Sequence, residues 1–115
     1  MGDTIFQKII DKEIEADVVY EDDVSLAFRD INPTAPVHVL VIPKEVISTT
    51  NDISDEQEKL VGHLVRVAAD IAKKEGIAED GYRLVINCNP DGGQSVYHLH
   101  VHLIGGEPLG WPPFQ

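Results

Sequence analysis

Residues 97–104 have the sequence Tyr97-His98-Leu99-His100-Val101-His102-Leu103-Ile104, in which a histidine occupies every second position of an apolar run. Side chains alternate between the two faces of a β-strand, so this spacing predicts a strand with all three imidazoles on one face. The opposite face is then the core face, formed by Tyr97, Leu99, Val101 and Leu103. The ordinary pKa of an imidazole is about 6.5, so we expect the row to supply a neutral nucleophile and a protonated acid near neutral pH.

The rest of the chain predicts four further strands and two helices. The strands are expected at residues 18–20, 25–28, 37–42 and 82–88. A short amphipathic helix is expected at residues 4–14, and a long helix is expected to start at the Ser-x-x-Gln capping box of residues 54–57 and to end at Gly76. Short connections favour antiparallel pairing. The predicted fold is therefore α+β, a single domain over residues 1–115 with about five strands in one antiparallel sheet, one long helix and one short helix.

Composition limits the classes of function. A chain of 115 residues, 43% of them apolar and with no apolar stretch approaching about twenty residues, predicts one globular domain that does not associate with a membrane. The start of the chain shows no pattern of a secretory signal, and the single cysteine, Cys88, fits a reducing compartment, so we expect a cytoplasmic location. The net charge of −11 argues against a nucleic acid polymer as partner, because such polymers are bound by basic surfaces.

Two kinds of chemistry compete for the histidine row. Zinc ligands lie about 2 Å from the ion, whereas the outer two positions of the row are roughly 13 Å apart along a strand, so all three histidines cannot easily share one ion. Two of them could bind zinc together with His38 of the 37–42 strand, and this stays the main alternative. No nearby carboxylate or paired cysteine strengthens that set, so nucleophilic catalysis by a central imidazole with two helpers is favoured.

A glycine-rich loop, Gly92-Gly93-Gln94-Ser95, stands directly before the histidine row. Glycine allows backbone amides to approach a ligand closely, and such loops form concave sites for anions, with the Ser95 hydroxyl as a further donor. The loop is two residues from the row, so a phosphate bound there would face the imidazoles. A small phosphorylated ligand is therefore the expected partner.

Residues 91–106 as a whole resemble the signature of the histidine-triad (HIT) family, most closely its Hint branch of histidine triad nucleotide-binding proteins. Residues 2–6, 27–31, 35–43 and 111–113 resemble the same branch, so the likeness spans nearly the whole chain. The transferase branch typically replaces the third histidine, which this chain keeps as His102. The Fhit-like branch does not usually carry the Ser-Val-Tyr lead-in at residues 95–97.

The resemblance implies a purine nucleoside phosphoramidase, which hydrolyses the P–N bond of adenosine or guanosine 5′-phosphoramidates, including lysyl conjugates of AMP, through a nucleotidyl-histidine. It implies His100 as the nucleophile, His102 as the residue that contacts the phosphate and helps the amine to leave, and His98 and His38 as supports of the catalytic imidazole. The nucleotide-binding residues that follow from it, together with the loop, are Asp30, Ile31, Asn87, Gly93, Gln94 and Ser95. Asp30 would accept hydrogen bonds from the ribose and Ile31 would line the base pocket.

The resemblance also implies catalysis without a metal or other cofactor, and a homodimer whose sheets join, with each C-terminal tail reaching toward the partner's site. A sheet edge that needs covering supports the homodimer independently. Two other functions stay open at this point. They are a non-enzymatic nucleotide-binding or interaction module, and a dinucleotide polyphosphate hydrolase.

Overall fold

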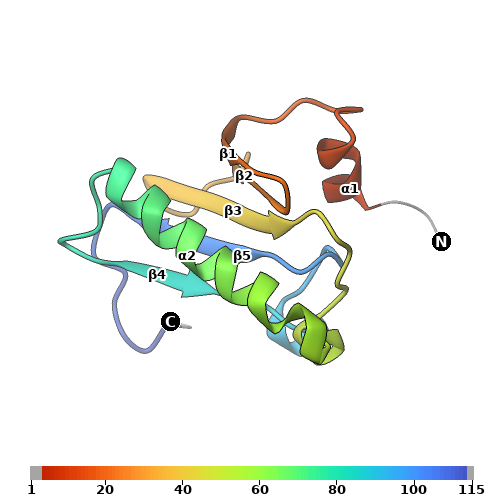
Figure 1. The fold of residues 1–115 in the computed structure, drawn as a ribbon. Coiled ribbons are helices and arrows are strands. Elements are labelled where there is room, and N and C mark those ends of the chain that lie inside the picture. The colour runs from red at the N-terminus through yellow and green to blue at the C-terminus, as the bar shows by residue number, and fades with distance from the viewer. Residues whose placement is uncertain (1–3, 114–115) are drawn as a thin grey trace.

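The computed structural model describes residues 4–113. The quoted residues 2 and 3, and the last two residues of the chain, lie outside this range. The elements in chain order are helix α1 (Ile5–Ile10), strands β1 (Val18–Glu21), β2 (Ser25–Arg29) and β3 (Val37–Pro43), 3₁₀ turns η1 (Thr50–Asp52) and η2 (Asp55–Gln57), helix α2 (Glu58–Lys74), strand β4 (Tyr82–Val85), 3₁₀ turn η3 (Pro90–Gly92) and strand β5 (Val101–Gly105). The expected α+β class is confirmed (Figure 1).

The five strands form one antiparallel sheet in the order β1-β2-β3-β5-β4. Strand β3, dense in β-branched residues and fully buried, lies at the centre between β2 and β5. Its pairing with β5 sets His38 opposite Ile104 and Leu40 opposite His102. His38 and His102 are therefore diagonal neighbours on the same face of the sheet.

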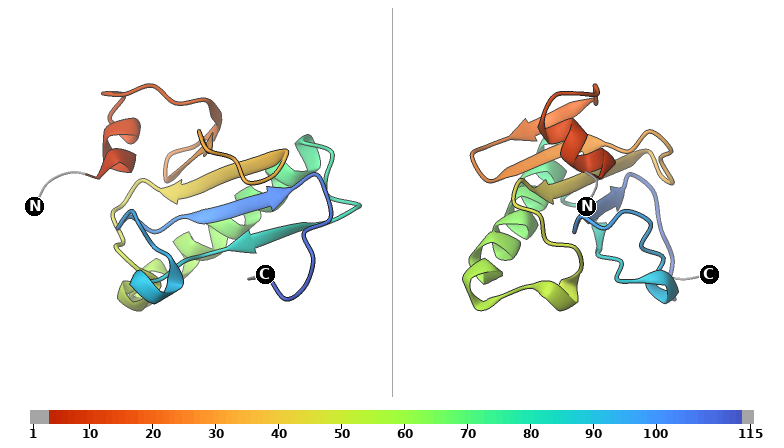
Figure 2. Two further views of the ribbon diagram at one scale, coloured as in Figure 1. Left: turned by 180° about the vertical axis from the view of Figure 1, so that it is seen from behind. Right: turned by 90° about the vertical axis from the view of Figure 1, so that its right-hand side faces the viewer.

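The two faces of the sheet carry different helices, as the views in Figures 1 and 2 show. Helix α2 lies across β3, β5 and β4, and its buried residues pack on odd-numbered positions such as Val39 and Val101. Helix α1 lies over the other face, where Phe6 packs with even-numbered positions such as Phe28 and Leu40. The alternation of side chains along β3 thus divides the core into a thick layer under α2 and a smaller cluster under α1.

The long helix follows the expected pattern with one difference at its start. Ser54 donates its backbone N–H to Gln57 Oε1 at 2.9 Å, as the capping box predicts, but residues 55–57 form a 3₁₀ turn and the α-helix begins at Glu58. The helix ends at Lys74, just before Gly76, whose φ of +78° is a left-handed conformation that suits glycine.

Three predicted elements are shorter than expected. The helix expected at residues 4–14 ends at Ile10, because Lys12 adopts a left-handed φ of 66° that closes the last turn. The strand expected at residues 82–88 ends at Val85, which pairs with His102 near the start of β5.

The third is the strand expected at residues 97–104, which begins only at Val101 and runs to Gly105. The ladder with β3 stops there because Pro43 has no N–H to donate. The Pro43 carbonyl instead accepts a hydrogen bond from the His98 imidazole at 2.7 Å. His98 and His100 therefore lie before the strand, with His98 at the end of a bend, and only His102 lies within it.

Candidate functional site

The three histidines keep their expected alternation although two of them precede the strand. Leu99, Val101 and Leu103 are buried in the core under α2, whereas the imidazoles face the α1 side. His98 and His100 are buried, and the ring centroids of His100 and His102 are 4.9 Å apart. Tyr97 is the exception: it was expected on the core face, but it is 39% exposed, because the chain there has no strand partner to hold it inward.

His100 is held as a neutral imidazole with one free ring nitrogen. Its Nδ1 lies 2.8 Å from the carbonyl oxygen of His98, and because a carbonyl only accepts, Nδ1 carries the proton and Nε2 keeps a free lone pair. The edge-on ring of Phe6, 5.0 Å away between centroids, packs against the imidazole. Burial lowers the pKa of His100, so the ring is neutral at pH 7. The expected support from His98 therefore comes through its backbone carbonyl.

His102 belongs to a short chain of hydrogen bonds. The backbone N–H of Thr34 donates to His38 Nδ1 at 3.1 Å, so the proton of a neutral His38 is on Nε2. That Nε2–H donates to His102 Nδ1 at 2.9 Å, which leaves the His102 proton on Nε2. The chain thus makes His102 a hydrogen-bond donor through Nε2. His38 thus contacts His102 directly, whereas the resemblance implies that His38 supports His100.

The protonated acid expected within the row is absent from the free protein. Burial, together with the neighbouring His100 and His38, lowers the pKa of His102 to about 4. Burial also lowers the pKa of His98, whose Nδ1 is buried and has no hydrogen-bond partner among the described residues. All three imidazoles of the row are therefore neutral at pH 7, because a charged ring would lose its hydration in this cluster.

Asp30 and Ile31 lie at the turn that follows β2. One Asp30 oxygen accepts the backbone N–H of Asn32 at 2.8 Å, which is the turn role that an aspartate before Asn-Pro suggests. The other oxygen lies 3.5 Å from His38 Nε2, beside the histidine chain. Ile31 is 88% exposed, which is unusual for so large an apolar side chain, and it borders the same pocket. Both predicted residues therefore line the pocket that His100 and His102 also line.

The glycine loop is braced from within. The Gln94 side chain is buried, and its polar atoms form hydrogen bonds within the protein. Its amide nitrogen donates to the carbonyls of Ser48 and Val96, and its oxygen accepts from Asn89 N–H. Gln94 therefore shapes the loop and does not present its side chain to a ligand. Asn87 donates to the Gly92 carbonyl at 2.7 Å, another contact within the loop.

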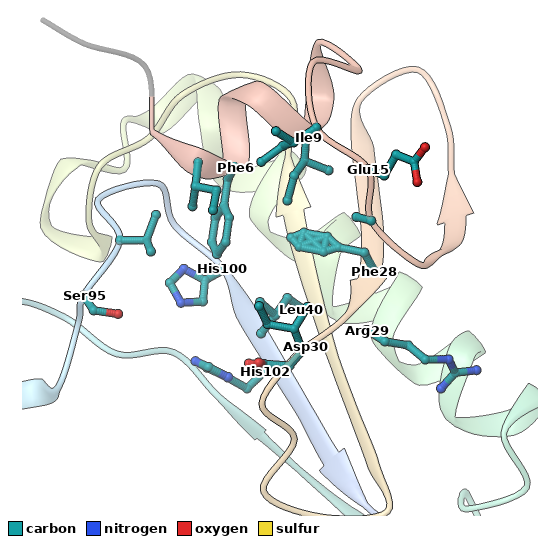
Figure 3. A pocket seen from close by; sticks show the side chains of 15 residues that line it. Phe6, Ile9, Glu15, Phe28, Arg29, Asp30, Leu40, Ser95, His100 and His102 are labelled. Atoms are coloured by element: carbon teal, nitrogen blue, oxygen red, sulfur yellow. The ribbon is translucent and has the colours of Figure 1, made fainter.

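Gly93 adopts a left-handed φ of 81°, a conformation that favours glycine, as the loop pattern predicts. Ser95 is exposed and lines the pocket near His100 and His102 (Figure 3). Of the predicted loop residues, Ser95 is the one whose side chain borders the pocket directly.

The pocket in front of the histidines has a volume of about 420 Å³. Figure 3 shows the side chains that line it. One end carries polar groups from His100, His102, Ser95 and Asp30. The remaining wall is mostly apolar and is formed by Ile5, Phe6, Ile9, Ile14, Ala16, Phe28, Ile31, Leu40 and Val96. A ligand with a flat apolar group linked to an anion matches this pocket, which has one polar end and a mostly apolar wall.

Apart from Ile31, which was expected to line the base pocket, the apolar wall was not predicted from the sequence. Phe6 and Ile9 were assigned only to a helix that caps the sheet, and Phe28 and Leu40 only to strands. A signal was available in the two strands that hold Phe28 and Leu40. Both strands carry apolar side chains on both faces, so the even-numbered face also needs an element packed over it. Only the fold shows that α1 leaves a pocket beside the histidines.

A metal ion is a further occupant to test against the geometry. Asp30, His38 and His102 each offer one ligand atom, and these atoms lie within 4.8 Å of one another. The sequence reasoning found no carboxylate near the histidines, and the structure corrects this with Asp30. The set does not fit a cation, however: Thr34 N–H donates to His38 Nδ1, so the facing Nε2 carries a proton and has no lone pair for a metal.

Comparisons with known proteins agree with this geometry. The chain is 59% identical over 108 residues to a protein of Escherichia coli (strain K12) named purine nucleoside phosphoramidase, covering 94% of this chain and 91% of the relative. It is 56% identical over 112 residues to a 14 kDa zinc-binding protein of Zea mays, covering 96% of this chain and 87% of that protein.

A solved structure of similar shape is a HIT family hydrolase from Legionella pneumophila Philadelphia 1, with a TM-score of 0.94 and 50% sequence identity over 96% of this chain and 99% of that one. The HIT domain profile matches residues 11–109, which include the whole sheet and all the histidines discussed above. The chain therefore belongs to the HIT domain family.

Proposed function

We propose that this protein is a purine nucleoside phosphoramidase, a hydrolase that cleaves the P–N bond of adenosine or guanosine 5′-phosphoramidates, including lysyl conjugates of AMP. The observation that carries the proposal is the hydrogen bond from His100 Nδ1 to the His98 carbonyl, which leaves Nε2 free as a nucleophile at the pocket. The name and 59% identity of the Escherichia coli relative support the same activity.

The reaction follows from the two tautomers. His100 Nε2 attacks phosphorus, the new N–P bond forms and the bond to the leaving amine breaks. That amine leaves well only when it is protonated, and the proton comes from His102 Nε2. Binding of an anionic phosphate raises the pKa of His102 from its low value, because an opposite charge favours the imidazolium, so the ring takes up a second proton from solvent and returns to the neutral form when it protonates the amine. Water then attacks the nucleotidyl-histidine, passes a proton to His102 and releases the nucleotide.

The pocket accommodates the substrate with its phosphate at the histidine end and its base along the apolar wall. The phosphate lies at the end formed by His100, His102 and Ser95, with Asn87 and Gly93 contributing from the loop. The Asp30 oxygen that lies beside His38 accepts hydrogen bonds from the ribose hydroxyls. The base covers Ile31, whose exposure in the free protein this contact would remove.

Substitution of the nucleophile tests the proposal. His100→Gln is expected to lower kcat by about 10³-fold or more and to abolish a nucleotidyl adduct in mass spectra of quenched reactions. His63→Gln is the matched control, because His63 is a histidine of α2 that pairs with Asp22 outside the pocket. Unchanged turnover in His100→Gln would contradict the assignment.

The same assays separate the other functions. Tight AMP binding without turnover of any phosphoramidate indicates a binding or interaction module. Faster cleavage of dinucleotide polyphosphates than of phosphoramidates indicates the polyphosphate hydrolase. Loss of activity on chelation would restore the zinc alternative, despite the unfavourable tautomer of His38.

We further propose one domain over residues 1–115 that acts in the cytoplasm as a homodimer with joined sheets. No helix within residues 4–113 has the length and apolarity to cross a membrane. Strands β1 and β4 are the two edges of the sheet, and an edge with free backbone groups favours pairing with a second copy. A monomeric mass by light scattering at micromolar concentration would contradict the dimer.

A further inference from the structure

The far end of the pocket carries one charged side chain without a partner. Glu15, in the connection between α1 and β1, lines the pocket and is exposed, and it forms no hydrogen bond or ion pair with any residue from 4 to 113. The nearby Lys12 pairs with Glu21 at 2.9 Å instead. Figure 3 shows the Glu15 carboxylate on the opposite side of the pocket from His100, beyond Ile9 and Phe28.

The other charged groups that line the pocket are already engaged. Arg29 makes two hydrogen bonds with Glu75, at 3.0 and 2.9 Å, and its guanidinium therefore points away from the pocket toward α2. Asp30 lies at the histidine end, where the turn and His38 hold it. Glu15 is thus the charged group available to whatever occupies the apolar end.

The proposed direction of the substrate brings the base to this carboxylate. Phosphate and ribose are held at the histidine end, so the base lies along the apolar wall with its outer edge toward residues 14–16. A carboxylate offers two acceptor oxygens side by side. Guanine presents two adjacent donors on its outer edge, N1–H and N2–H₂, and can pair with both oxygens. Adenine presents one donor, N6–H₂, beside the N1 lone pair, which the negative charge repels.

We infer that Glu15 selects guanosine over adenosine phosphoramidates by accepting two hydrogen bonds from guanine. The inference rests on the proposed function and deepens it. Hydrogen bonds to a charged acceptor are stronger than neutral ones, but exposure to water weakens them, so we expect a preference of about threefold to tenfold in kcat/KM.

Three substrates and one pair of variants test this inference. The guanosine 5′-phosphoramidate offers the carboxylate two donors, and the inosine compound offers one. The adenosine compound offers one donor beside a lone pair that the carboxylate repels, so kcat/KM is expected to fall in the order guanosine, inosine, adenosine. In Glu15→Gln the amide can donate to adenine N1 and accept from N6, and it can equally donate to guanine O6 and accept from N1–H, so the guanosine-to-adenosine ratio is expected to fall to about one. Glu13→Gln removes the same charge from the same connection outside the pocket lining, and is expected to leave the ratio unchanged.

Calorimetric binding of GMP, IMP and AMP to the same variants keeps the test independent of catalysis. Weaker GMP binding in Glu15→Gln, with AMP binding kept or improved, supports the inference even if no phosphoramidate is cleaved. If Glu15→Gln cleaves all three substrates with the ratio of the unaltered protein, the role of Glu15 is refuted and the phosphoramidase function stands. Equal changes in Glu13→Gln and Glu15→Gln would also refute it, because the effect would then be one of net charge.

Discussion

Lowering the pH from 7 to 4.5 is expected to destabilise the folded protein by about 2 kcal/mol through His102 alone. The pKa of His102 is about 4 in the folded protein, against 6.5 for an unperturbed histidine. The unfolded chain therefore binds more protons between these two values, and stability falls as the pH decreases through this range. At pH 4.5 an unfolded histidine is almost fully protonated, whereas roughly a quarter of folded molecules carry the proton, which gives the stated free energy.

Urea unfolding of the unaltered protein and His102→Gln, at several pH values from 7 to 4.5, measures this contribution. The variant is expected to lose about 2 kcal/mol less than the unaltered protein over the range, while the buried His98 and His100 still destabilise both on acidification. Imidazole proton shifts in NMR spectra, assigned by comparison with the variant, give the titration midpoint directly. A midpoint for His102 at or above 6.5, or equal acid sensitivity of the two proteins, would refute the neutral hydrogen-bonded chain.

Other substitutions test the surrounding framework. Gly106→Ala is expected to cost about 1–3 kcal/mol in urea unfolding, because its φ is +96° and the added Cβ would lie 2.9 Å from Pro36 Cβ. Gly62→Ala, in open space on α2, is expected to stabilise by up to about 1 kcal/mol, and a loss there would contradict the helix. Leu64→Ala is expected to cost about 3 kcal/mol from the core under α2, also by urea unfolding. Gln94→Ala removes three internal hydrogen bonds of the loop. Steady-state kinetics are therefore expected to show a raised KM with a smaller change in kcat. An unchanged KM would argue against the role of Gln94 in holding the loop.

The alternating histidines show which structural features a local sequence pattern can predict. The period of two placed the imidazoles on one side and Leu99, Val101 and Leu103 on the other, and this held even where no strand forms. Such alternation survives because any extended backbone points successive side chains in opposite directions. The start of the strand could not be read in the same way, since it depends on the carbonyl of Pro43, which is distant in sequence and is bonded by His98.

The sequence by itself determined the α+β class, the capping box of the long helix, the side on which each histidine lies and, through its motifs, the likeness to the HIT family. Only the tertiary structure decided the tautomer of each histidine, because the tautomers depend on Thr34, His38 and the diagonal pairing of β3 with β5. Burial also reversed one expectation, since a row of ordinary imidazoles would be partly charged near neutral pH, whereas this packed row is neutral. A local pattern specifies on which side of the backbone each side chain lies. Desolvation and hydrogen-bond partners come from segments that only the fold brings together.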